Sequence, residues 1–341
     1  MKQALVLAAV AALSTPLAGA PASPGGRLLV ANKGDHTLGL VEPGAGRQVA
    51  ALAESGITAH EVAASPDGRF AYLPIYGDSG VGRPGSDGST IDVFDLGAHR
   101  RVATIDLGRP ERPHAAHFGR DGRLYVTTEL TNTITVIDPR TNTVVDRIPT
   151  GQAESHMLVL SRDGRRAWTS NVGPGTVSAI DLAAKKVVAV IPVAKKAQRI
   201  ALSVDERHLF TADQGAPRLA VVDAAKNAVE RWVDLPGVGY GTAPTPDGRF
   251  LLVTVTTTSQ VAVVDLAEWK VIRAIDVPKA PQEVVVRPDG RVAYVSCDAS
   301  GKVAAIDLAA WAVGRLIDAG PFVDGLAWAP LSRDEGRRPE E

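Results

Sequence analysis

A turn that recurs at intervals of about 42 residues most constrains the fold of this chain, because such a period, made of short apolar runs, is typical of a repeat architecture. Asp163, Asp205, Asp247 and Asp289 are evenly spaced at this interval, and all but Asp205 open an Asp-Gly-Arg sequence. Another Asp-Gly-Arg begins one interval before Asp163, at Asp121. The chain is therefore expected to consist of one structural unit repeated several times.

One complete unit of the repeat covers residues 245–286. It opens with a Thr-Pro-Asp-Gly turn, in which proline fixes one φ and Asp-Gly tolerates the left-handed conformation that closes the turn. Four short runs rich in β-branched residues follow, separated by turn residues: RFLLVTV, VAVVD, WKVIRAIDV and EVVV. This pattern predicts a four-stranded antiparallel meander.

The second of these runs occurs seven times along the chain. Its positions are 38–42, 91–95, 134–138, 177–181, 219–223, 261–265 and 303–307. Seven such units without a helical period predict an all-β, seven-bladed β-propeller of four-stranded antiparallel blades. The chain enters at 27–33, which aligns with a second strand, and ends at 323–329, which aligns with a first strand. We therefore expect the C-terminal strand to join the first blade and close the ring.

The repeat is clearest in two segments, DGRVAYV at 289–295 and NTITVID at 132–138. These motifs resemble those of the YVTN-repeat propellers, the group that includes surface-layer-type and YncE-like periplasmic proteins. The resemblance covers roughly residues 27 to 330 and implies a propeller fold. It does not select one function, because relatives of this shape include binding proteins, metal or haem oxidoreductases and lactonase-like hydrolases.

The N-terminal residues 1–22 are typical of a secretory signal peptide, because a lysine near the start precedes an apolar stretch and small residues. The apolar stretch is too short to span a bilayer. We therefore expect a secreted or periplasmic monomer without a membrane span. Its single propeller domain would comprise residues 23–331, followed by a polar tail at 332–341.

Composition excludes several classes of function. Cys297 is the sole cysteine, so the chain has no internal disulfide and no Cys-x-x-Cys-His attachment for c-type haem. Removing residues 1–22 deletes one lysine and leaves 36 basic against 38 acidic residues. The chain therefore has no excess of positive charge that would favour binding to nucleic acid. Gly239-Tyr240-Gly241 resembles half of a dinucleotide fingerprint, but no strand-then-helix context follows, so no nucleotide cofactor is expected.

One position in each unit, seven residues before the turn aspartate, should line the mouth of the central channel. The innermost strands of a propeller surround this channel, and the position lies where each strand enters it. Three consecutive units place histidine there: His60, His114 and His156. The other units have Gln198, Tyr240, Gln282 and Asp324.

Imidazoles from three neighbouring strands could together bind one transition metal ion and leave positions open for water or substrate. The residues do not distinguish Cu, Fe and Zn. Glu61 and Glu283, each beside a mouth position, could hold the histidine tautomers or act as a base, and Arg199 could bind an anionic group of the substrate. The protein would then be a metal-dependent oxidoreductase or lyase, with Glu61, Arg199 and Glu283 as its catalytic residues.

Other interpretations of this mouth remain open. It could bind a small ligand without a metal, or its polar residues could solvate a water-filled channel. The protein could also be a non-catalytic scaffold that binds a protein partner on this face, here called the top face. A lactonase-like hydrolase is disfavoured because the sequence offers the mouth few carboxylates. On the top face we also expect His36, a candidate fourth ligand, and a Gly-rich insertion at 77–89 that could form a lid.

Overall fold

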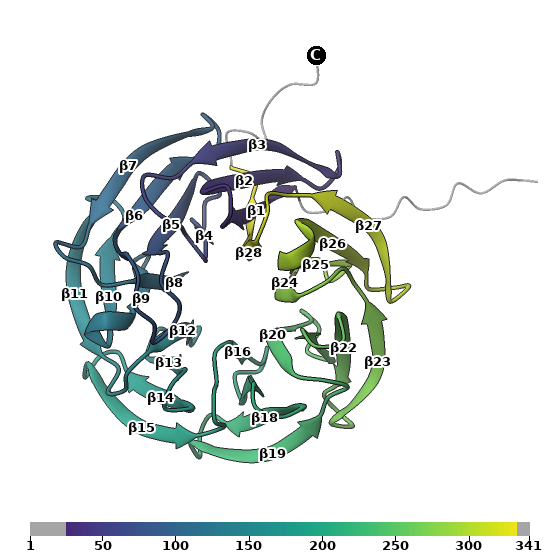
Figure 1. Ribbon diagram of the computed structural model, residues 1–341. Helices are drawn as coiled ribbons and strands as arrows, with labels where there is room; N and C mark the ends of the chain where they lie inside the picture. Colours follow the sequence, from purple (N-terminus) through teal and green to yellow (C-terminus); the bar gives the residue numbers. More distant parts are fainter. Residues whose placement is uncertain (1–24, 333–341) are drawn as a thin grey trace, which may run out of the picture.

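The computed structural model describes residues 25–332, which form a ring of seven four-stranded antiparallel sheets (Figure 1). This confirms the predicted seven-bladed propeller. The predicted signal peptide at 1–22 lies outside the described residues, as does residue 333 onward of the predicted tail. Within the described part of the chain, no helix is long and apolar enough to cross a membrane.

Within each blade, the four strands follow one another from the channel outward. Blade 1 contains β28 (Val323–Pro330), β1 (Gly26–Asn32), β2 (Thr37–Glu42) and β3 (Arg47–Ala53). Blade 2 contains β4 (Ala63–Ala64), β5 (Phe70–Gly77), β6 (Asp87–Asp95) and β7 (Arg100–Asp106). Blade 3 contains β8 (Pro113–Phe118), β9 (Leu124–Thr128), β10 (Thr133–Asp138) and β11 (Thr143–Pro149). Blade 4 contains β12 (Ser155–Leu160), β13 (Arg166–Asn171), β14 (Thr176–Asp181) and β15 (Lys186–Pro192).

The remaining three blades follow the same order. Blade 5 contains β16 (Ala201–Leu202), β17 (His208–Asp213), β18 (Arg218–Asp223) and β19 (Ala228–Asp234). Blade 6 contains β20 (Gly239–Pro244), β21 (Phe250–Val255), β22 (Gln260–Asp265) and β23 (Lys270–Asp276). Blade 7 contains β24 (Pro281–Val286), β25 (Val292–Cys297), β26 (Lys302–Asp307) and β27 (Ala312–Asp318). Two short 3-10 helices, η1 (Glu129–Thr131) and η2 (Asp298–Ser300), follow β9 and β25.

The ring closes as the repeat predicts. Strand β28 pairs antiparallel with β1, with Leu28 opposite Trp328 and Leu29 opposite Ala327. Leu28 also belongs to a buried apolar cluster with Tyr294 of blade 7, so the first blade packs against the last. Closure removes the edge strand that an open ring would leave unpaired.

The burial of each strand follows from its place in the blade. In β10, all four residues from Ile134 to Ile137 are buried, because neighbouring blades cover both faces of a middle strand. In the outer strand β11, exposed and half-buried residues alternate over 143–147, as expected where one face meets solvent. The core therefore lies between the blades.

The recurrent aspartate stabilises the turn between the first two strands of a blade. The Asp247 Oδ1 atom accepts hydrogen bonds from the backbone N–H of Arg249 at 3.1 Å and from the Thr245 hydroxyl. Gly248 has a φ of +70°, a conformation that glycine adopts without steric cost. The inner strands begin at the opposite end, which is the top face.

Candidate functional site at the top-face mouth

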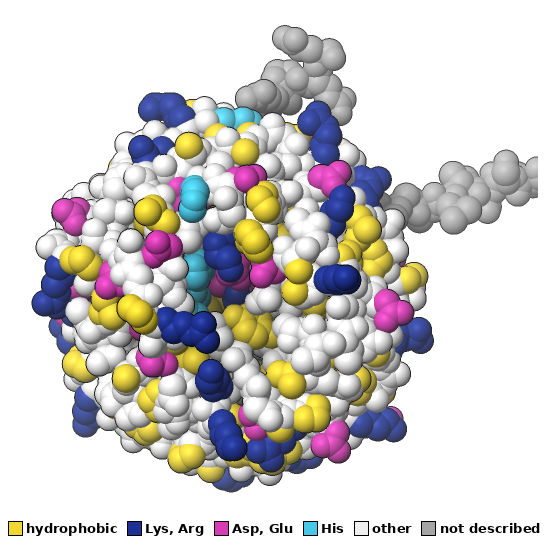
Figure 2. Space-filling model, viewed as in Figure 1, with side chains coloured by type: hydrophobic (Ala, Val, Ile, Leu, Met, Phe, Trp, Pro, Cys, Tyr) yellow, Lys and Arg dark blue, Asp and Glu magenta, His cyan; other side chains and the backbone are white. Residues whose placement is uncertain are grey.

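The structure brings the three predicted histidines together. The ring centroids of His60 and His114 are 5.5 Å apart, and those of His114 and His156 are 3.5 Å apart. The Tyr76 ring, at the end of β5, stacks on His60 with a centroid distance of 4.6 Å. The molecule is hollowed at the centre of this face, where His side chains gather with Lys, Arg, Asp and Glu side chains (Figure 2).

His156 is held in one tautomer by hydrogen bonds to both ring nitrogens. Gln214 donates to the Oε1 atom of Gln198, and this fixes the Gln198 amide so that its Nε2 donates to His156 Nε2 at 3.1 Å. His156 Nε2 is therefore the acceptor nitrogen, and Nδ1 carries the proton. Nδ1 donates to Glu129 Oε2 at 3.3 Å.

Glu129 is the carboxylate that orients the histidines, and it was not predicted from the sequence. It is buried at the start of η1, and its Oε2 atom also accepts from the Tyr76 hydroxyl at 2.7 Å. Its Oε1 atom accepts from Arg112 Nη1 at 3.2 Å. Burial alone would raise the pKa of Glu129, but the hydrogen bonds from His156, Tyr76 and Arg112 bring the pKa below its ordinary value. Glu129 is therefore ionised at neutral pH.

His60 and His114 differ from His156, because no hydrogen bond within the described residues reaches either ring. His114 is 2% exposed, and its Nδ1 atom is buried without a partner. Burial lowers the pKa of His60 to about 4 and lowers the pKa of His114 and of His156 as well. All three imidazoles are thus neutral at pH 7, which is the form that binds metals.

The relative orientation of the rings bears on the predicted three-histidine metal ion. The planes of His114 and His156 are only 31° apart, so the rings lie nearly face to face. Ring lone pairs point within the ring plane, so one ion shared by these two rings would lie far out of both planes. Among residues 25–332, no group of three or more His, Cys, Asp or Glu side chains is placed to hold a metal ion. The ion bound by all three histidines stays a prediction.

Arg199 forms a second cluster in the mouth and pairs with the two other predicted residues. Its guanidinium contacts Glu61 at 2.7 Å and Asp324 at 3.1 Å, and it also pairs with Glu283. Lys33 lies 3.2 Å from the other oxygen of Asp324. Glu61 and Glu283 therefore neutralise Arg199 rather than orient a histidine, and the catalytic roles of all three residues stay predictions.

The acidic groups of this cluster respond differently to the same surroundings. Burial raises the pKa of Glu61 despite the nearby Arg199 guanidinium. Burial alone would also raise the pKa of Asp324, but the charges of Lys33 and Arg199 hold this pKa below the ordinary value. The mouth contains more carboxylates than we expected from the sequence, but their charges are balanced mainly by Arg199 and Lys33.

Two other residues considered in the sequence lie outside these clusters. His36 is exposed in the turn between β1 and β2 and takes no part in the ring contacts of the three histidines. Cys297 is fully buried, and burial raises the pKa of its thiol to about 12. At neutral pH the thiol is protonated, so it packs as a small apolar side chain.

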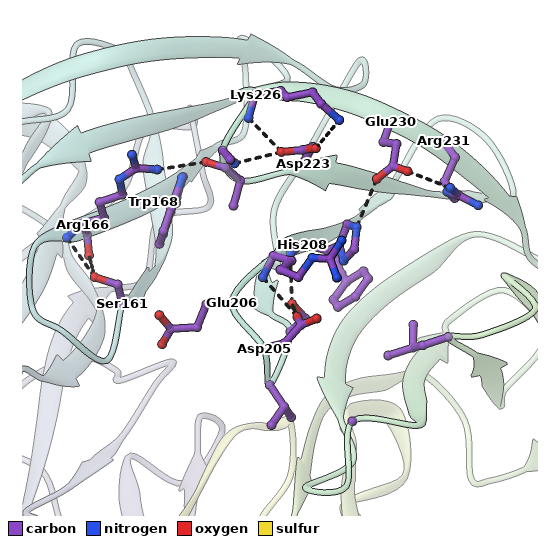
Figure 3. A pocket seen from close by; sticks show the side chains of 18 of the residues that line it. Ser161, Arg166, Trp168, Asp205, Glu206, His208, Asp223, Lys226, Glu230 and Arg231 are labelled. Carbon is purple, nitrogen blue, oxygen red and sulfur yellow. Dashed lines mark hydrogen bonds and ion pairs between the residues drawn. The ribbon is translucent and has the colours of Figure 1, made fainter.

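A separate hollow of about 980 Å³ lies at the other end of the inner strands, beside the turns of blades 4 to 6 (Figure 3). Its charged side chains pair with one another: Glu230 contacts Arg231 at 2.7 Å and His208 at 3.1 Å. Asp223 pairs with Lys226 at 2.8 Å. The mouth differs from this hollow in having a buried histidine nitrogen without a partner, Nδ1 of His114, so the chemistry of this chain is better sought there.

One protein-family model matches part of the chain. Residues 123–236 match the family described as the cytochrome D1 heme domain. The matched segment is about a third of the chain, and it includes Glu129, His156, Gln198 and Arg199 of the mouth. No protein with a curated function matches the sequence.

Solved structures show the same fold at low sequence identity. Hydrazine synthase of Kuenenia stuttgartiensis is 19% identical, with a TM-score of 0.71, covering 86% of this chain and 99% of that chain. The dihydro-heme d1 dehydrogenase NirN in complex with DHE is 16% identical, with a TM-score of 0.67, covering 92% and 78%. The periplasmic gluconolactonase PpgL of Pseudomonas aeruginosa is 17% identical, with a TM-score of 0.72, covering 89% and 99%.

Proposed function

We propose that the top-face mouth binds an iron tetrapyrrole of the d1-haem type, and that the protein is a periplasmic oxidoreductase acting through it. The observation that carries this proposal is the His114 imidazole, which is neutral, buried and without a hydrogen-bond partner. The match of residues 123–236 to a d1-haem domain supplies the ligand class. The predicted signal peptide and the fold shared with a periplasmic lactonase support the compartment.

The side chains at the mouth suit such a group in three ways. A single imidazole can hold a haem iron, so His114 alone would hold the group, whereas a three-histidine ion needs three rings that point to one place. Lys33, whose side chain is only partly buried, could pair with a carboxylate on the ring. The top-face loops also expose three large apolar side chains that could cover a flat ring: Ile57 (48% exposed), Leu130 (44%) and Phe322 (57%).

When bound, the iron centre would supply one-electron redox chemistry. The remaining tasks belong to the chain. His114 would hold the group, and Glu129 would keep the neighbouring His156 ring in the tautomer with a proton on Nδ1. Glu61, whose pKa is raised by burial, could hold and release a proton closer to neutral pH than an ordinary carboxyl group.

The test is a spectroscopic titration of the mature protein with haem b and, separately, with d1-type haem. We expect a one-to-one change in the absorption spectrum with d1-type haem. His114→Ala should weaken binding at least tenfold, whereas His208→Gln, at the opposite face, should leave it unchanged. No spectral change with either tetrapyrrole, or an unaffected His114→Ala variant, would overturn the proposal.

Each alternative predicts a different result in the same preparation. Tight binding of Zn²⁺ or Cu²⁺ that needs all three histidines would favour the metal-ion interpretation. Hydrolysis of a sugar lactone by tetrapyrrole-free protein would favour a lactonase. Protein that binds neither tetrapyrrole nor metal ion and hydrolyses no lactone would point to a scaffold for a protein partner.

A further inference from the structure

Arg112 connects the inserted loop of blade 2 to the wall of the mouth. On the loop side, its Nε atom donates to Asp87 Oδ1 at 2.6 Å and its Nη2 atom donates to the Arg83 carbonyl at 2.7 Å. Its Nη1 atom lies 3.4 Å from the Gly80 carbonyl. The Arg112 side chain is 6% exposed, so it is enclosed by the groups that it holds.

The same guanidinium reaches the histidines through one carboxylate. Nη1 donates to Glu129 Oε1 at 3.2 Å, and the other oxygen of Glu129 accepts from Tyr76 and His156. Tyr76 immediately precedes the loop and stacks on His60. One side chain thus bonds simultaneously to the loop at 77–89 and to the acid that orients His156.

The backbone around Arg112 reinforces this connection. Both Glu111 and Arg112 donate their N–H groups to the Gly88 carbonyl at 3.0 Å, and Glu129 donates its N–H to the Arg112 carbonyl at 3.2 Å. Arg112 has a φ of +50°, a left-handed conformation that is unfavourable for a residue with a Cβ atom. A Cβ atom at Gly88 would lie 1.7 Å from the Ile75 carbonyl oxygen, so only glycine allows this close approach.

The loop also extends as far as the entrance of blade 4. A Cβ atom at Gly82 would lie 2.5 Å from a carboxylate oxygen of Glu154, two residues before His156. Within the loop, Asp78 and Ser86 bond to each other through two backbone N–H groups, at 2.6 and 3.1 Å. The insertion is therefore a tethered cover beside the histidines and not the free lid that its glycines suggest.

We propose that Arg112 is a positioning residue that couples the closed loop at 77–89 to the orientation of the Glu129–His156 pair, and through it to the ligand at the mouth. This inference rests on the proposed function for the identity of that ligand. Coupling between two sites is reciprocal. A ligand bound beside His156 should therefore protect the loop, and loosening the loop should weaken binding of the ligand.

The decisive variant is Asp87→Asn, because Asp87 holds Arg112 from the loop side and has no contact with a histidine ring. Arg112→Lys keeps the charge, but an ammonium has only three N–H groups and lacks the planar fork that reaches the four acceptors of Arg112. Arg83→Ala is the matched control, because Arg83 contributes only its carbonyl, which the variant retains. All three are made in the full mature chain.

Two measurements need no ligand. Hydrogen exchange of the amides at 78–89 should accelerate at least tenfold in Asp87→Asn and Arg112→Lys but not in Arg83→Ala. In protein with ¹⁵N-labelled histidine, the Nδ1–H resonance of His156, assigned with His156→Gln, should shift in the same two variants only. Exchange that accelerates while this resonance stays in place would overturn the coupling, as would a loop that remains protected in both variants.

The third measurement brings in the ligand. Adding d1-type haem should slow exchange in the wild-type loop, and Asp87→Asn should bind it about fivefold more weakly. Unchanged affinity in a variant with a loosened loop would contradict the coupling. Failure of wild-type protein to bind tetrapyrrole would instead refute the proposed function, while the His156 resonance would still decide whether Arg112 positions the pair.

Discussion

Glu54 should make the stability of this propeller depend on pH in an unusual direction. Its side chain lies at the loop that leads to His60, where Oε2 accepts from the Ala59 N–H at 3.0 Å and Oε1 is buried without a partner. Burial raises the pKa of Glu54 from 4.5 to about 8, against the opposing effect of the Ala59 hydrogen bond, and the nearby Asp92 charge raises it further. The folded protein therefore holds a proton on Glu54 that the unfolded chain releases above pH 4.5.

The sign and size of the effect follow from this difference. The contribution of Glu54 to the free energy of unfolding is fully present below pH 4.5 and is lost as the pH rises through 8. Each pKa unit corresponds to about 1.36 kcal/mol, so the full difference would be about 5 kcal/mol. Because the side chain is partly accessible to solvent, we expect about 2 kcal/mol.

Glu54→Gln tests this reasoning, because glutamine keeps the carbonyl that accepts from Ala59 and carries no charge. Urea unfolding should give equal stabilities for variant and wild type at pH 5. At pH 9 the variant should be about 2 kcal/mol more stable. Glu42→Gln, an exposed position at the end of β2, is the control and should track the wild type throughout. A variant that follows the wild type from pH 5 to pH 9 would show that Glu54 is ionised in the fold.

Two further predictions concern the ring and its charged centre. Deleting residues 322–341 removes β28, so blade 1 loses its inner strand and exposes an unpaired strand edge. The truncated protein should be poorly soluble and should show no cooperative thermal unfolding. A truncated protein that melts like the intact one would refute ring closure by this strand. Arg199→Met leaves three carboxylates in the mouth without their shared cation, which should cost about 3–5 kcal/mol at pH 7 in urea unfolding. The loss should be smaller at pH 5, where Glu61, whose pKa is raised by burial, takes up a proton more readily, and an equal loss at both pH values would argue against charge repulsion.

The repeat made the fold and the mouth positions predictable from sequence. Its constant period fixes which residues are equivalent, so identifying the mouth position in one unit identified the corresponding position in all seven. His114 contacts His60 and His156 for this reason, although the three side chains belong to three different units of the chain. Neither contact required knowledge of any loop conformation.

The partners of these histidines were not predictable in the same way, because they come from loops where the repeat breaks. Glu129 lies in a short 3-10 helix after β9, and Arg112 lies in a connection whose length differs from the other units. The insertion at 77–89 marked one place where the repeat does not predict the structure. Glu61 and Glu283, each next to a mouth position in the sequence, pair with Arg199, and their predicted roles beside the histidines stay predictions.

The two clusters of the mouth connect side chains from most blades of the ring. The histidine cluster comes from blades 2 to 4 and is tied to blade 5 through Gln198. Arg199, the next residue of blade 5, contacts Glu61 of blade 2, Glu283 of blade 7 and Asp324 of the closing strand β28. A single buried side chain thus bonds across the axis to three other blades. Arg199, Glu61 and Asp324 are buried and paired here, beside a His114 imidazole whose Nδ1 atom has no partner, and this arrangement is suited to holding a ligand at the mouth.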